Sequence, residues 1–123
     1  MEYERFEELV IKALSELPEE FQEKLENIDV TVAERPTSGQ LSKMGLSRST
    51  SLLGLYEGVP LTRRGRRYGM VLPDKITIFQ KPIESKCRGE REIAREIRSV
   101  VCHEIAHHFG MDEASLRRIE SEI

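Results

Sequence analysis

Two histidines and a glutamate near the end of the sequence have the residue types and spacing of a metal site. All three histidines of the chain fall within residues 100–113, and His103, Glu104 and His107 form a His-Glu-x-x-His pattern. Residues four apart on a helix share a face, so His103 and His107 can offer ring nitrogens to one ion while Glu104 lies beside them. A zinc ion (Zn²⁺) held this way lowers the pKa of a bound water to about 7, and the carboxylate can take the proton as that water attacks a carbonyl. The pattern predicts a zinc hydrolase, most simply a peptidase.

The helix that would carry this pattern is predicted over residues 90–109. Apolar residues recur along it at helical spacing, and Gly110 follows where it should end, because glycine adopts the left-handed conformation without steric cost. Glu104 comes eleven residues after Ile93, about 20° from it around the helix axis, so its carboxylate should lie within the apolar stripe. A buried carboxylate needs a partner, and a metal-activated water would be one. The alternative is that the histidines are ordinary surface residues and Glu104 pairs with a buried arginine.

The third histidine and the cysteines are expected to be structural. His108 lies near the apolar stripe but away from the edge that His103 and His107 share, which predicts a packed, hydrogen-bonded core histidine. Cys102 projects about 100° from His103, which favours a buried thiol over a ligand. Cys87 and Cys102 are too few for a disulfide framework and would stay reduced in the cytoplasm.

The third ligand of the predicted zinc must come from elsewhere, because a catalytic zinc usually has three protein ligands and one open position. Gly110 allows the chain to turn back toward the metal, and Asp112 and Glu113 are the ligand types that follow it. Asp112 also suits the N-cap of a last short helix predicted over residues 112–123. This competing role favours Glu113 as the ligand, with Asp112 as the alternative.

Length and composition indicate a single domain over residues 1–123. The formal net charge of −3 gives no general attraction to nucleic acid or to an anionic membrane. No apolar run approaches transmembrane length, and the first residues lack the basic and apolar regions of a secretion signal. The expected location is therefore the cytoplasm, without membrane attachment.

The order of predicted elements indicates an α+β domain, in which one small twisted mixed sheet packs against helices. The edge of such a sheet, above the metal helix, would suit an extended peptide, because edge backbone groups can pair with a substrate main chain. The remaining predicted elements are helices over 3–17 and 18–27, strands over 28–33, 52–61, 68–72 and 75–80, a loop over 34–51 with one turn at 41–46, and a helical turn over 82–86.

A cluster of four arginines, the Arg63–Arg67 cluster, surrounds Gly65. Clustered arginines can bind phosphate backbones or acidic substrates. With no aromatic residue beyond Tyr68 nearby and an acidic chain overall, a solvated hairpin tip is the favoured interpretation, and nucleic acid is not the expected partner. Metal-dependent nucleic-acid processing or RNA binding through this cluster remains the alternative function, together with a zinc-binding module without turnover.

Three segments in the second half of the chain carry a family resemblance. Residues 53–61 (LGLYEGVPL), 72–79 (LPDKITIF) and 103–110 (HEIAHHFG) together resemble the small bacterial zincin-like metallopeptidase family, single-domain proteins regarded as minimal zincins. The resemblance implies a zincin fold with a small sheet and a long active-site helix. It also implies zinc on His103 and His107, with Glu104 as the general base.

The same family bears on the third ligand and on the substrate. Its pattern usually continues His-x-x-Gly-x-x-Asp, and Glu113 stands where the family places its aspartate, which implies Glu113 as the third ligand. The bacterial rRNA-maturation metal proteins have a comparable helix with three histidine ligands, but they lack the glutamate that is present here as Glu104. The expected substrate is accordingly a peptide or an unfolded protein.

Overall fold

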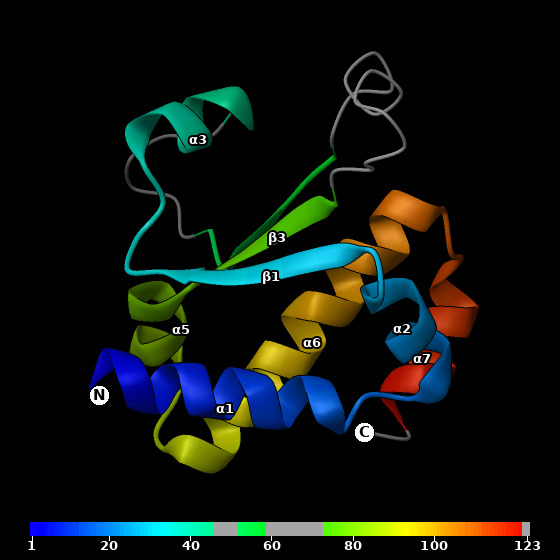
Figure 1. Ribbon diagram of the computed structural model, residues 1–123, viewed down its shortest axis with the longest axis horizontal. Coiled ribbons are helices and arrows are strands. Elements are labelled where there is room, and N and C mark those ends of the chain that lie inside the picture. The colour runs from blue at the N-terminus through cyan, green and yellow to red at the C-terminus, as the bar shows by residue number, and fades with distance from the viewer. Residues whose placement is uncertain (46–51, 59–72, 122–123) are drawn as a thin grey trace.

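The computed structural model describes residues 1–45, 52–58 and 73–121, with only the backbone of residues 113 and 119 (Figure 1). These parts form one three-stranded mixed sheet with helices packed against it, so the predicted α+β fold is confirmed. The elements are α1 (Tyr3–Ser15), α2 (Glu19–Leu25), β1 (Ile28–Ala33), α3 (Ser38–Lys43), β2 (Gly54–Glu57), β3 (Asp74–Phe79), α5 (Gln80–Lys86), α6 (Glu90–Phe109) and α7 (Glu113–Glu120).

The sheet has the order β1-β3-β2, with β1 parallel and β2 antiparallel to β3. The strand predicted over 28–33 is confirmed as β1, and the strand predicted over 75–80 is β3, which begins and ends one residue earlier. Of the strand predicted over 52–61, the described residues contain the four-residue strand β2. The strand predicted over 68–72 and the Arg63–Arg67 cluster lie outside the described residues. Within the described sheet, β2 is an edge strand.

The core forms where α6 packs between α1 and the sheet (Figure 1). Both helices bury side chains at three- and four-residue spacing, because that spacing aligns them along one face of a helix. The isoleucines of β3 complete the core from the sheet side. The central side chains, fully or almost fully buried, are Phe6, Leu9, Val10, Ala13, Ile76, Ile78, Ile93, Ile97, Val101 and Ile105. Helix α6 is thus in contact with α1 on one side and with the sheet on another.

The segment predicted as a loop with one turn contains a short helix, α3, that starts earlier than expected. Thr37 caps it: its hydroxyl accepts from the Gln40 N–H at 3.0 Å, and the Gln40 side chain accepts from the Thr37 N–H at 2.9 Å. This reciprocal capping box requires threonine and glutamine three residues apart, a pattern that the sequence contains. Pro18, predicted at the first helical position of the second helix, is the N-cap of α2 instead.

The end of α6 reverses the chain as predicted. Gly110 is left-handed, with φ 68° and ψ 30°, and the Met111 N–H returns to the Ala106 carbonyl at 2.9 Å. Asp112 then caps α7, its carboxylate accepting from the Ser115 N–H at 2.7 Å. As a result α7 packs back against α6. None of the described helices combines the length and the apolar character that crossing a bilayer requires.

Candidate metal and catalytic site

His103 and His107 project from the same side of α6. Their ring centroids are 6.3 Å apart, and the His103 side chain is 43% exposed. His107 is also exposed. The four-residue spacing on a helix thus brings both rings to the surface next to one another, where an ion from solvent can reach them.

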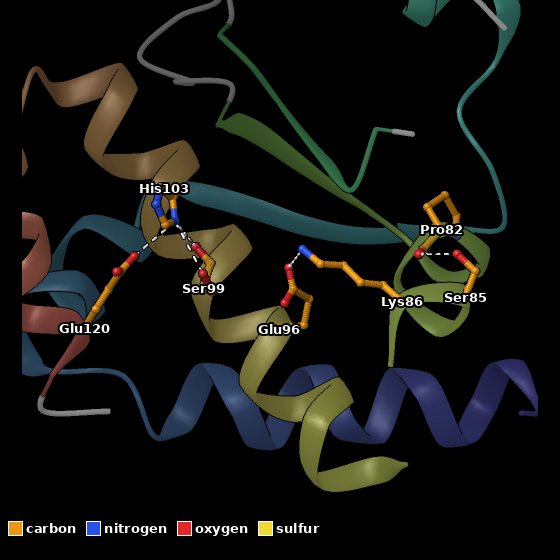
Figure 2. Close-up of polar contacts among 7 residues, drawn as sticks. All are labelled: Pro82, Ser85, Lys86, Glu96, Ser99, His103 and Glu120. Atoms are coloured by element: carbon orange, nitrogen blue, oxygen red, sulfur yellow. Dashed lines mark hydrogen bonds and ion pairs between the residues drawn. The ribbon is translucent and has the colours of Figure 1, made fainter. Parts of the chain in front are cut away.

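The hydrogen bond of His103 defines which of its ring nitrogens can bind a metal. The Nδ1 atom lies 2.8 Å from the carbonyl oxygen of Ser99, one turn earlier in α6 (Figure 2). A carbonyl oxygen only accepts hydrogen bonds, so Nδ1 carries a proton, and in the neutral ring Nε2 therefore keeps its lone pair. A ring fixed in this tautomer is suited to coordinate a metal through Nε2.

Glu104 is half-buried, and its carboxylate contacts the edge strand. The Oε1 atom accepts a hydrogen bond from the Tyr56 N–H of β2 at 2.9 Å. Burial raises the pKa of Glu104, and the Tyr56 N–H and the two histidines act against that rise. The structure therefore agrees with the prediction that Glu104 lies in the apolar stripe and needs a partner. The partner that the structure describes is a backbone amide of β2, not a buried arginine.

The orientation of β2 explains why a backbone amide is available to Glu104. The Phe79 N–H donates to the Leu53 carbonyl at 3.0 Å, so odd-numbered residues of this strand direct their backbone groups toward β3. Even-numbered residues, Gly54 and Tyr56, direct theirs to the outer edge. That edge faces α6, so the sheet presents main-chain groups directly beside Glu104.

Gly54 allows the close approach of β2 to α6, a role that the sequence reasoning missed. A Cβ atom added to Gly54 would lie 2.5 Å from Val100 Cγ1 of α6 and 3.4 Å from the Thr77 carbonyl oxygen. Any side chain there would push the edge strand away from the helix. The sequence did contain an indication, because a glycine inside a strand pattern often marks a close backbone approach.

A groove of about 370 Å³ leads along α6 to His103 and Glu104. An ion pair between Lys86 and Glu96, 3.0 Å long, also borders it (Figure 2). The other residues of its wall are mainly aliphatic or small: Leu52, Leu53, Gly54, Ser99 and Val100. The groove therefore has a mainly apolar or small-residue wall next to His103 and Glu104.

His108 is not a core residue, so that prediction is wrong. Its side chain is 41% exposed, and its ring stacks on the Tyr56 ring with 4.0 Å between centroids. The His108 Nε2 atom lies 3.6 Å from Oδ2 of the buried Asp74, and the Tyr56 hydroxyl donates to the same oxygen. In the last turn of α6, the His108 side chain extends toward the outer part of β2 and not toward the core. His108 therefore helps to hold Tyr56 in place.

The candidates for the third ligand are only partly described. The carboxylate of Asp112 is the cap of α7, and the Ser115 N–H lowers its pKa. Glu113 is the first residue of α7, and its side chain lies outside the described part of the structure. Among the described residues, no three side chains of the metal-binding types come together. Glu113 therefore stays a prediction.

Cys102 is fully buried, as predicted. Burial raises the pKa of its thiol to about 12, and the nearby Glu120 carboxylate adds to this effect. A cysteine binds a metal as the thiolate, and the surroundings of Cys102 disfavour that form, so Cys102 is better suited to a structural role.

A His-Glu-x-x-His pattern on a helix is typical of zinc metallopeptidases. The family model of zincin-like metallopeptidases matches residues 25–123, so the chain belongs to the zincin-like metallopeptidase family. A search of curated proteins finds no match. Membership implies a metal-dependent peptidase and the use of zinc.

Proposed function

We propose that the chain is a zinc-dependent peptidase in which His103, His107 and Glu113 hold Zn²⁺ and Glu104 is the general base. The observation that supports this most directly is the place of Glu104. Its carboxylate has a raised pKa, lies on the helix that carries the two histidines, and borders a groove beside an edge strand.

The described donor atoms fit zinc. Two imidazoles four residues apart reach the same surface, and the Ser99 carbonyl leaves His103 Nε2 free of a proton. Neutral imidazole is among the ligands that zinc prefers in proteins. When bound, zinc supplies Lewis acidity, which polarises a carbonyl oxygen and acidifies water.

The residues of the chain supply proton transfer and positioning. Burial makes the Glu104 carboxylate more basic than an ordinary glutamate, so it can accept a proton from the attacking water and return it to the leaving amine. The Tyr56 N–H holds that carboxylate on the side of α6 that faces β2. Stacking on His108 and the hydrogen bond to Asp74 hold Tyr56 in turn.

The proposed substrate is an extended peptide or an unfolded protein. Main-chain groups of Gly54 lie at the outer edge of β2, where a substrate strand can pair with them. The aliphatic part of the groove would take an apolar side chain beside Glu104. A folded protein would not present its backbone in this form, which favours unstructured substrates.

Zinc content and the Glu104→Gln variant test the mechanism. We expect about one zinc per wild-type chain by elemental analysis. Glu104→Gln should keep the fold and the zinc while losing roughly 10²–10⁴-fold in hydrolysis of unstructured protein, because only the base is removed. A wild-type protein that contains no zinc after dialysis against zinc would refute the metal site. Full activity of the Glu104→Gln variant would show that Glu104 is not the general base.

The third ligand is tested by comparing neighbouring acids. Glu113→Ala should weaken zinc affinity by orders of magnitude, because it removes one of three protein ligands. Asp112→Ala is the matched control: it should lower the thermal midpoint by removing the cap of α7 and leave zinc affinity largely intact. Unchanged affinity in Glu113→Ala would show that another group completes the site.

The RNA-processing alternative is tested in the same assays by offering RNA beside unstructured protein. Metal-dependent cleavage of RNA alone, abolished by changing Arg63 and Arg64, would replace the peptidase proposal.

A further inference from the structure

Glu120, the last residue of α7, brings a carboxylate against His103. Its Oε1 atom lies 3.1 Å from the Nδ1 atom of the ring (Figure 2). The Nδ1 proton is directed to the Ser99 carbonyl at 2.8 Å, and Oε1 is a buried atom with no hydrogen-bond partner among the described residues. A buried, negatively charged oxygen thus lies beside the protonated nitrogen of the proposed ligand.

The packing of α7 places this carboxylate. Leu116 is 2% exposed and anchors the helix against the core. Glu120 follows four residues later and shares its face of α7. The reversal at Gly110, which returns the chain along α6, therefore also delivers Glu120 to His103.

A carboxylate in this position changes how strongly the ring binds a cation. Donation of electron density from Nε2 to a metal leaves positive charge on the ring, and an anion about 3 Å from Nδ1 stabilises that charge. Loss of such a group behind a ligating histidine typically costs 10–100-fold in metal affinity.

We propose that Glu120 is a positioning residue of the metal site, where it orients His103 and strengthens its bond to zinc from the side opposite Nε2. The inference rests on the proposed zinc site. It assigns a second task to α7, because this helix starts at the proposed ligand Glu113 and ends at Glu120.

Zinc affinity of the full-length protein, measured by competition with a chromophoric chelator, tests this role. Glu120→Gln keeps the size of the side chain and should raise the Kd for zinc by roughly 10–100-fold. Glu92→Gln is the control, since it removes the same charge from an exposed residue of α6 that lies eleven positions before His103, about 16 Å away along the helix. The Kd of this control should stay close to that of the wild type, because solvent screens charges beyond about 8 Å. Glu120→Asp, which keeps the charge at a greater distance, should lose less affinity than Glu120→Gln.

Several outcomes would overturn the proposal. Equal affinities of Glu120→Gln and Glu92→Gln would show that the carboxylate of Glu120 has no specific role. A loss as large as that of Glu113→Ala would make Glu120 a ligand instead. If the metal-free thermal midpoint of Glu120→Gln fell as far as that of Leu116→Ala, a loosened α7 would explain the lower affinity. A wild-type protein that binds no zinc would refute the proposed function itself, so the two failures are distinguishable.

Discussion

The contact between Gly54 and Val100 predicts that Gly54→Ala damages both stability and activity. The new Cβ would lie 2.5 Å from Val100 Cγ1, whereas carbon atoms pack best about 3.5–4.0 Å apart, so β2 and α6 must separate by about 1 Å. Overpacking of this kind costs about 1–3 kcal/mol of unfolding free energy. If the same shift lengthened the 2.9 Å Tyr56–Glu104 hydrogen bond to about 3.9 Å, the bond would be lost.

Chemical denaturation of the metal-free protein and hydrolysis of an unstructured protein measure these two effects. Gly39→Ala is a matched control, because a Cβ at Gly39 would meet only the Thr37 hydroxyl oxygen at 3.8 Å, an ordinary contact, and Gly39 lies within α3, where alanine is favoured over glycine. Val100→Ala removes the clashing methyl, so the double variant Gly54→Ala/Val100→Ala should be more stable than the sum of the single effects predicts.

The reasoning would be refuted if Gly54→Ala unfolded at the wild-type denaturant concentration and kept full activity. Loss of stability without any rescue by Val100→Ala would also contradict it, since the clash would then lie elsewhere. If Gly54→Ala lowered stability but left activity unchanged, the position of β2 would not be required for the function of Glu104.

Three other predictions concern neighbouring contacts. Tyr56→Phe removes a hydrogen bond to the buried Asp74 and should cost about 1 kcal/mol of stability, as measured by denaturant unfolding; an unchanged value would mean that the bond contributes nothing. Alkylation of the native protein, followed by mass spectrometry, should modify the half-buried Cys87 well before Cys102, because burial raises the pKa of the Cys102 thiol to about 12. Equal alkylation rates of the two cysteines would contradict the burial of Cys102. The Ser115 N–H lowers the pKa of Asp112 in the folded protein. The capping carboxylate therefore stabilises the fold fully at a pH above the ordinary carboxyl pKa, and this stabilisation is lost as the pH falls through the lowered pKa of Asp112. The midpoint difference between wild type and Asp112→Ala should therefore be present at neutral pH and vanish in acid.

Local patterns of the sequence were enough to predict the elements that carry the proposed chemistry. The extent of α6 from Glu90 to Phe109, the left-handed Gly110 and the capping Asp112 all follow from helical periodicity and from the conformational preferences of single residues. The shared face of His103 and His107 follows from the helix repeat alone. These features depend on residues within a few positions of each other, which is why the sequence predicts them.

The partners of those residues were decided by tertiary structure. Helix periodicity placed Glu104 in an apolar stripe, but only the packing of β2 on α6 supplies the Tyr56 N–H as its partner. The same periodicity assigned His108 to the core, whereas the sheet edge turns it into a support for Tyr56.

Glu120 lies seventeen positions after His103, and nothing in the local pattern relates the two. They meet only because the reversal at Gly110 and the burial of Leu116 direct α7 back along α6. A sequence pattern defines the direction of a side chain relative to its own helix or strand. Which atoms it meets there depends on how distant segments pack, and that packing is a property of the whole core.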